Sequence, residues 1–328
     1  MKNKKTLTKK PTKFLKVLKS IGLILVSLII VGFIYEQISE YIDAKTLKAP
    51  GQMIQVGDHK IHIYCTGENI NGNPTIVMIP GAGSSYFTFF KIQPTLSKYT
   101  KVCSYDPAGF GFSEGASDGR TAKDTANELK LTLDNANIEG PYLIVGHSLG
   151  GAYAQVFAKD NIKSIIGMVL IDSSCVEQAE IKDPPIPFFI NAINNAISSA
   201  FYVGLPRLAM TISPEAMGLH RDNGKIERSI VAKPFRETNK TSILTGALNS
   251  VEQVKQASNF DNLPITILEA DGSQKQATEL WGDKIGQCHK KMAAFSASAK
   301  YILVQNSEHF IQDDQPQVVI DAIKEMLK

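Results

Sequence analysis

A glycine-rich motif around a serine, GHSLGG at positions 146–151, matches the pattern G-x-S-x-G. The apolar run Tyr142 to Val145 precedes the match and a helical pattern follows it, which places the serine on a strand-to-helix turn. Glycines leave room where a sharp turn brings backbone segments close together, and they hold the Ser148 hydroxyl at its tip. A glycine-rich turn with an idle serine is the alternative, but the surrounding strand and helix favour a nucleophile.

A serine hydroxyl is a weak nucleophile at neutral pH and needs a base within hydrogen-bond reach. His309 fits that role best, because it follows the apolar run Tyr301 to Val304 and precedes the last helical pattern. Its loop should open at the same edge of a parallel sheet as Ser148. The other histidines fit less well by position: His59, His62, His147, His220 and His289.

Acyl transfer also needs two backbone N–H donors for the oxyanion that develops on the attacked carbonyl group. We expect one donor at Leu149, where a helix begins, because the first amides of a helix are unpaired and its dipole is positive there. We expect the other at Ala82, in the turn Pro80 to Ser84 that follows the apolar run Thr75 to Ile79. A plain turn is the alternative for that segment.

Eight short runs are the strands expected to position these residues. They cover 51–56, 60–65, 75–79, 102–105, 142–145, 165–171, 265–268 and 301–304. Most of them are unbroken apolar runs, which suits strands buried on both faces of a parallel sheet. Helical patterns lie between them, at 121–137, 152–158 and 316–327. The alternation predicts an open α/β sheet whose ligand lies beyond the carboxyl ends of the strands.

The alternation breaks in residues 176–261, where prolines at 184, 185 and 187 precede apolar helical stretches. We interpret 176–261 as a helical cap, inserted into a core made of 51–175 and 262–328. The apolar stretch Ile186 to Met210 suggests an acyl chain or another apolar group as part of the substrate.

Five segments together resemble the α/β-hydrolase superfamily. They are Pro80 to Ser84, Asp106 to Ser113, Gly146 to Gly151, Val169 to Asp172, and Glu308 to Phe310. The resemblance covers roughly residues 51–328 and implies a mostly parallel eight-stranded sheet with helices on both faces. It also implies a Ser-acid-His triad, no cofactor, and a cap that shapes the substrate pocket. Two positions depart from the family pattern: Pro80, where many members carry histidine, and Glu308, where many carry glycine.

The resemblance offers two positions for the acid of the triad. Asp271 follows the seventh strand, a residue or two earlier than the usual loop position, and Asp172 ends the sixth strand. We favour Asp172, because a strand end holds a side chain more rigidly than a Gly-Ser loop does. Asp271 remains the alternative acid, and Asp106 is interpreted as structural.

The N-terminus carries an apolar run preceded by lysines. Ile21 to Tyr35 holds no charge, and with Phe14 to Leu18 the run reaches the length of about 20 residues that a helix needs to cross a bilayer. We interpret 1–19 as a basic cytoplasmic tail, 20–36 as a single transmembrane anchor and 37–50 as a linker, with the body extracytoplasmic. A cleaved signal peptide is disfavoured because no small-x-small site follows the run, and a helix lying on the membrane surface is a further alternative.

The strand order implied by the resemblance pairs two of the four cysteines. It places the run 60–65 beside 102–105, so Cys65 and Cys103 are expected to form a structural disulfide. An extracytoplasmic body permits such a bond.

Composition excludes several other classes of function. With 43% apolar and 20% charged residues, the chain of 328 can bury a substantial core. The net charge is +3, but eight lysines precede residue 20, so the body is acidic and lacks the basic stripe of a nucleic-acid-binding protein. No Cys/His ligand cluster, Walker-type loop or G-x-G-x-x-G motif predicts a metal, nucleotide or flavin site.

The sequence therefore predicts a membrane-anchored serine hydrolase that cleaves a small-molecule carboxylic ester, or an amide, through an acyl-enzyme. Epoxide hydrolases and dehalogenases of the superfamily carry aspartate where this chain has Ser148, which disfavours their chemistry. The alternative is a non-catalytic, membrane-anchored binding protein on the same fold.

Overall fold

The computed structural model describes residues 13–70, 72–115, 120–175, 199–213, 226, 228–230, 246–275 and 287–328. The chain divides into two compact units. The helical unit comprises Met1–Leu47 and Phe188–Ser229, and the sheet unit comprises Lys48–Pro187 and Ile230–Lys328. The unit with the sheet carries all the residues of the predicted active site.

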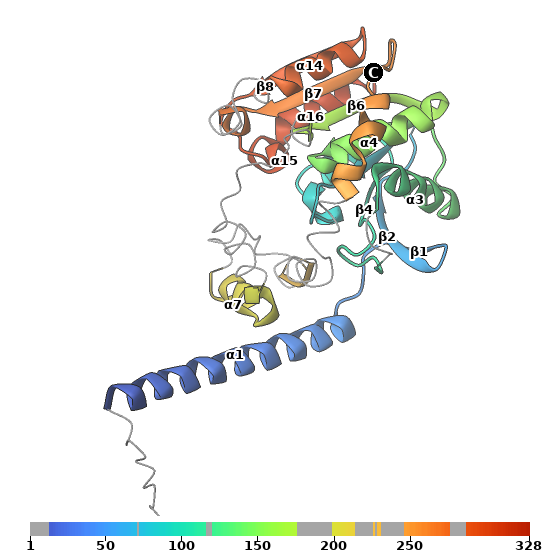
Figure 1. Ribbon diagram of the computed structural model, residues 1–328. Helices are drawn as coiled ribbons and strands as arrows, with labels where there is room; N and C mark the ends of the chain where they lie inside the picture. Colours follow the sequence, from blue (N-terminus) through green and yellow to red (C-terminus); the bar gives the residue numbers. More distant parts are fainter. Residues whose placement is uncertain are drawn as a thin grey trace, which may run out of the picture. The chain divides into compact units, whose positions relative to one another are not determined.

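One eight-stranded sheet forms the centre of the sheet unit (Figure 1). Its strands are β1 (Gln52–Val56), β2 (His59–Thr66), β3 (Thr75–Ile79), β4 (Val102–Tyr105), β5 (Tyr142–His147), β6 (Ile165–Ile171), β7 (Ile265–Ala270) and β8 (Ala299–Val304). The order across the sheet is β1-β2-β4-β3-β5-β6-β7-β8. The pairs β1–β2 and β2–β4 are antiparallel and all other pairs are parallel. The predicted fold class is therefore confirmed.

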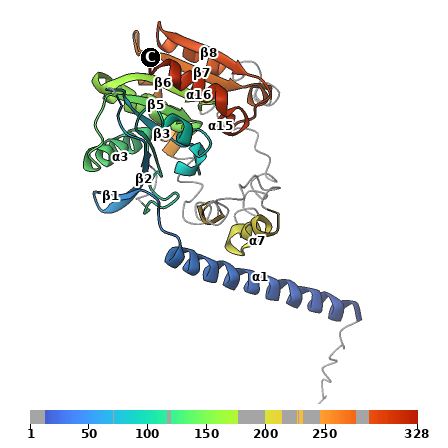
Figure 2. The same cartoon turned by 180° about the vertical axis from the view of Figure 1, so that it is seen from behind.

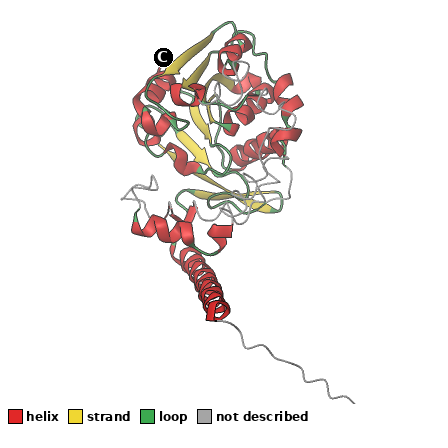
Figure 3. Ribbon diagram, turned by 60° about the vertical axis from the view of Figure 1, so that its left-hand side comes forward, coloured by secondary structure: helices red, strands yellow, loops and turns green. Residues whose placement is uncertain are grey.

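Helices cover both faces of this sheet (Figures 2 and 3). Helices α3 (Ala122–Asn135) and α4 (Leu149–Asp160) pack on one face, and α2 (Gln93–Leu96) and α16 (Pro316–Glu325) pack on the other. The alternation along β3 shows why both faces are apolar: Val77 belongs to one buried cluster, and Ile76 and Met78 belong to the other. A strand covered on both faces needs apolar side chains at successive positions, and β3 has them from Ile76 to Ile79.

Residues 250–256, within the segment predicted as a cap (176–261), contact the start of α3 in the sheet unit. Helix α11 (Val251–Gln256) belongs to the sheet unit, because the Ser250 hydroxyl accepts a hydrogen bond from the amide of Ala122 at 2.7 Å. The side chain of Gln253 accepts one from the amide of Lys123 at 2.9 Å. These bonds satisfy two of the unpaired amides at the start of α3. Most of the predicted cap, including residues 176–198 and 231–245, lies outside the described residues.

Helix α1 (Lys13–Thr46) is longer than the predicted anchor. The segment predicted as a linker, 37–50, is helical as far as Thr46. By length and composition, Phe14–Thr46 could cross a membrane, with a mean hydropathy of 2.6 over its most apolar window and none of that window buried.

Cys65 and Cys103 face each other across the antiparallel pair β2–β4 and form a disulfide, with their Cα atoms 4.0 Å apart. A second disulfide, which the sequence did not predict, joins Cys175 to Cys288 across 113 positions of the chain.

Candidate active site

Ser148 occupies a strained position between β5 and α4. Its backbone has φ 54° and ψ −127°, a conformation that residues other than glycine rarely adopt. Three hydrogen bonds hold it there: the Ser148 amide donates to Ile171 O at 3.0 Å, and its carbonyl accepts from the amides of Gly151 and Ser174, both at 2.9 Å. The end of β6 therefore clamps the turn that presents the serine hydroxyl.

Close backbone approach explains the glycines around this turn. A Cβ atom on Gly150 would collide with the carbonyl oxygens of Ile79 and Pro80. A Cβ atom on Gly81 would lie 2.9 Å from the Cβ of Ser148. The turn Pro80 to Ser84 therefore lies directly against the serine.

His309 connects Ser148 to Asp172. Its Nε2 lies 2.9 Å from the Ser148 hydroxyl oxygen, and its Nδ1 lies 2.7 Å from Asp172 Oδ2. With the Nδ1 proton donated to the carboxylate, Nε2 is left to accept the serine proton. The three residues come from different parts of the chain, because Ser148 follows β5, Asp172 follows β6 and His309 follows β8.

Asp172 is held in a buried, ionised state. It is 4% exposed, and its Oδ1 accepts a hydrogen bond from the amide of Ala270 at 3.0 Å. Burial alone would raise the pKa of Asp172, but the hydrogen bond from His309, the nearby charge of His289 and the Ala270 amide outweigh it. The net effect is a pKa below the usual value for aspartate, so the group stays a carboxylate at neutral pH.

Asp271, the alternative acid, has other partners. Its Oδ1 accepts from the amide of Ser307 at 3.1 Å, and its Oδ2 lies 3.0 Å from Lys275 Nζ. Together with Glu308, these residues line an open polar hollow that does not include Ser148. In this structure Asp271 organises the loop before His309, and it is Asp172 that contacts the imidazole.

His147 was set aside as the base in the sequence analysis, and in the structure its partner is the backbone of His309. The His147 ring lies 4.7 Å from the His309 ring, centroid to centroid, and its Nε2 donates to the His309 carbonyl at 2.9 Å. Burial, and next the charge of His309, lower the pKa of His147 to about 4. His147 is therefore neutral above that pH, and it packs against the loop that carries His309.

His289, also passed over, lies behind Asp172. Its Nδ1 is 2.9 Å from Glu269 Oε1 and its Nε2 is 2.8 Å from Ser173 O, so both ring nitrogens act as donors and the ring is cationic. Burial opposes that charge, but the bond to Glu269 and the charge of Asp172 outweigh burial and raise the pKa of His289. No local pattern in the sequence marks this residue, because its partners lie on β7 and after β6.

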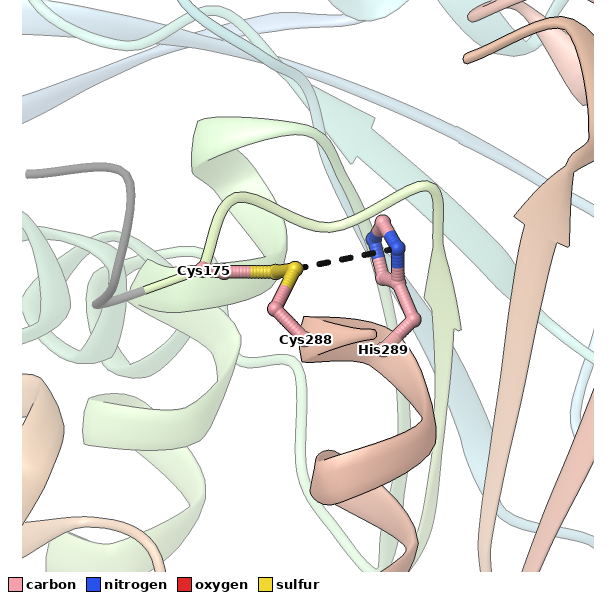
Figure 4. A group of neighbouring side chains, drawn as sticks. All are labelled: Cys175, Cys288 and His289. Atoms are coloured by element: carbon pink, nitrogen blue, oxygen red, sulfur yellow. Dashed lines mark hydrogen bonds between the residues drawn. A yellow bond between two sulfur atoms is a disulfide. The ribbon is translucent and has the colours of Figure 1, made fainter. Parts of the chain in front are cut away.

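The disulfide Cys175–Cys288 adjoins this buried histidine (Figure 4). Among the described residues, Cys175, Cys288 and His289 are the one group of His, Cys and carboxylate side chains close enough to hold a metal ion. The two sulfurs are bonded to each other. Of the His289 ring nitrogens, Nδ1 is bonded to Glu269 and Nε2 to Ser173. The group therefore fits a structural link between the loop after β6 and helix α14 (Cys288–Met292), and does not fit a metal site.

The two predicted oxyanion donors, Leu149 and Ala82, follow Ser148 and Gly81, and Gly81 lies against the serine. Leu149 is the first residue of α4, so its amide precedes the first hydrogen bond within that helix. Ala82 is exposed in the turn that contacts Ser148. Asp106 fixes the segment that follows this turn, because its carboxylate accepts from the amides of Tyr86 at 2.6 Å and Phe112 at 2.8 Å.

Comparison with known proteins gives the family of the chain. The sequence model of the alpha/beta hydrolase family matches residues 76–322. An uncharacterized protein of Schizosaccharomyces pombe is 23% identical, over 86% of this chain and 56% of its own length. The chain therefore spans little more than half of that relative. The uncharacterized protein YqjL of Bacillus subtilis is 26% identical over 76% of this chain and 81% of its own length.

Solved structures show the same fold. The Cif epoxide hydrolase from Acinetobacter nosocomialis superposes with a TM-score of 0.65, over 90% of this chain and 97% of that one, at 17% identity. At this level of identity the likeness shows the architecture and leaves the reaction to be argued from the site.

Proposed function

Since the chain belongs to the alpha/beta hydrolase family, we propose that it is a serine hydrolase that cleaves a carboxylic ester of a small molecule through an acyl-enzyme. The observation that carries the proposal is the pair of hydrogen bonds of His309: its Nε2 accepts from the Ser148 hydroxyl at 2.9 Å and its Nδ1 donates to Asp172 at 2.7 Å. These distances lie within the reach that a nucleophile and its base require.

In the first half of the reaction, the Ser148 hydroxyl attacks the carbonyl carbon of the substrate. His309 Nε2 takes the serine proton as the new C–O bond forms, and Asp172 stabilises the imidazolium that results. The oxyanion accepts hydrogen bonds from the amides of Leu149 and Ala82. His309 then gives the proton to the leaving alcohol as the ester bond breaks, and this leaves the acyl group on Ser148.

In the second half, water replaces the alcohol. His309 removes a proton from the water, which attacks the acyl-enzyme, and then returns that proton to Ser148 as the carboxylic acid leaves. No step needs a cofactor or a metal ion. An amide can follow the same path, because Ser148 attacks the same kind of carbonyl carbon and His309 then gives its proton to the leaving amine.

A nucleophilic serine argues against epoxide opening, although the fold is shared with an epoxide hydrolase. That reaction in this superfamily proceeds through an aspartate ester, and residue 148 is a serine.

The proposal includes an anchor to the membrane. Helix α1 supplies the span, with the lysine-rich N-terminus in the cytoplasm and the sheet unit outside. The disulfides Cys65–Cys103 and Cys175–Cys288 support an oxidising compartment for the sheet unit.

The proposal is tested by labelling the full-length protein, in detergent, with a fluorophosphonate probe that reacts with activated serines. Wild type should be labelled, and Ser148→Ala and His309→Ala should lose labelling while keeping the circular dichroism spectrum of the wild type. A folded wild-type protein that is not labelled would instead support the second candidate, a non-catalytic binding protein that retains the fold.

A further inference from the structure

Helix α7 (Leu205–Ile212), in the helical unit, exposes a stripe of apolar side chains. Leu205, Leu208 and Ile212 are 56%, 44% and 72% exposed, and Tyr202, just before the helix, is 44% exposed. The spacings of three, four and seven residues place the three aliphatic side chains on one face. Exposed apolar side chains that cluster in this way mark a surface that contacts something other than water.

The opposite side of this segment packs against α1. Along Phe14–Thr46, the residues that are not exposed are Gly32, Glu36, Ser39, Glu40 and Asp43. Spacings of four and seven residues put Gly32, Glu36 and Asp43 on one face of α1. At Gly32 a Cβ atom would collide with the carbonyl oxygen of Val203, so the two segments touch through backbone there.

A buried ion pair fixes the position of α7 along α1. Arg207 Nε lies 3.0 and 2.9 Å from the two carboxylate oxygens of Glu36, and its Nη1 bonds to Asp43. Arg207 is 6% exposed and Glu36 is 1% exposed. A buried pair of this kind specifies which residues meet, because a shift by one turn would leave a charge buried without its partner.

This contact lies at the end of the apolar span. Gly32 is three residues before Tyr35, where the uncharged run ends, so a helix rise of 1.5 Å per residue puts the contact with Val203 about 5 Å inside that end. When α1 crosses a bilayer, Val203 therefore lies at the depth of the interface. Leu205 and Leu208 flank Arg207, which pairs with Glu36 one residue beyond that end, so the stripe begins at the same depth.

We propose that α7 is an interfacial helix, which lies on the bilayer leaflet at the C-terminal end of the apolar span of α1, with Leu205, Leu208 and Ile212 facing lipid. Helices of this kind bury their apolar face about 5–10 Å into the boundary between headgroups and acyl chains. Tyr202 suits that depth, because its ring is apolar and its hydroxyl is polar. The inference rests on the membrane anchor of the proposed function and is independent of the hydrolytic chemistry.

The test places a single fluorescent reporter on the stripe of the full-length protein. In a Trp281→Phe background, which removes the one native tryptophan, Leu208→Trp is reconstituted into phosphatidylcholine vesicles with or without brominated acyl chains. Phe33→Trp, within the span, is the reference. We expect brominated lipid to quench the fluorescence of both variants at least twofold.

The two ways of failing are distinct. Quenching of Phe33→Trp without quenching of Leu208→Trp would overturn the docking of α7, whether water or another protein covers the stripe. Absence of quenching in Phe33→Trp would overturn the anchor itself.

A matched pair of glycine substitutions tests the role of α1. Gly32→Leu should push Val203 away and reduce the quenching of Leu208→Trp. Gly22→Leu should leave that quenching unchanged, because a Cβ atom on Gly22 meets nothing within 4 Å. Equal quenching in both backgrounds would contradict the inference that α1 positions α7.

Discussion

The neutral ring of His147 donates a hydrogen bond to the backbone carbonyl of His309, with 2.9 Å between Nε2 and the oxygen. The residue directly before Ser148 therefore supports the loop that carries His309. His147 touches no reacting atom, so its role is positioning: it fixes His309 at a hydrogen-bonding distance from Ser148.

His147→Ala should lower kcat about tenfold with little change in KM, since loss of one such bond costs about 1–1.5 kcal/mol. His147→Gln should restore part of kcat, because its amide can donate at a similar reach. The readout is the rate of hydrolysis of an activated aryl ester over pH 5–9. Equal losses in both variants would mean that packing, and not the hydrogen bond, is what matters.

Asp172→Asn should lower the rate of fluorophosphonate labelling by about 10³- to 10⁴-fold, because an amide neither stabilises the imidazolium nor enforces the tautomer that leaves Nε2 free. Asp271→Asn is the matched control, since Asp271 bonds to Ser307 and Lys275. It should change the rate less than tenfold. The reverse ranking would make Asp271 the acid.

The cation of His289 should make part of the folding stability depend on pH. Its pKa is raised in the folded state above the ordinary 6.5, so its contribution is fully present below pH 6.5 and is lost as pH rises through the folded-state value. His289→Ala should therefore lower the free energy of unfolding by about 3 kcal/mol at pH 6, where it breaks a buried pair with Glu269, and by less at pH 9.

Urea denaturation of wild type and His289→Ala between pH 5.5 and 9 measures this difference. Glu269→Gln is the second variant and should flatten the same pH dependence. A difference between wild type and His289→Ala that stays constant with pH would show that the histidine is not charged in the folded protein.

The two disulfides should differ in how much they stabilise the sheet unit. Cys175–Cys288 joins residues 113 positions apart, and Cys65–Cys103 joins residues 38 apart. Because closing a longer loop costs the unfolded chain more entropy, Cys175→Ser with Cys288→Ser should cost about 1 kcal/mol more than Cys65→Ser with Cys103→Ser. Urea denaturation of the two double variants tests this, and an equal or opposite ranking would count against the entropic account.

The features that were predicted correctly from the sequence are those that depend on neighbouring residues in the chain. Apolar runs located all eight strands to within two residues at most ends, and Thr121 was included at the start of the helical pattern that becomes α3, where it is the N-cap. Ser148 and His309 were identified because each lies next to a strand end, and the parallel sheet gathers those ends at one edge.

The features that the sequence did not predict depend on partners far away in the chain. Glu36 was predicted to end the anchor and Asp43 to lie in the linker, yet in the structure both pair with Arg207 and α1 continues past them. The sequence around Cys288 and His289 does not indicate that these residues bind the loop after β6, through Cys175 and Ser173. No motif or strand end beside these residues indicates that their partners lie more than a hundred positions away.

The backbone conformation at Ser148 is strained, and the function of its hydroxyl is the reason to keep a serine there. A residue other than glycine at φ 54° and ψ −127° is destabilised by about 1–3 kcal/mol, and glycine would relieve most of that strain. Ser148→Gly should therefore melt at a higher temperature than wild type while hydrolysing nothing. Without selection for hydrolysis, such a replacement would cost nothing and would relieve strain. A lineage that no longer hydrolysed its substrate would therefore be expected to lose this serine early.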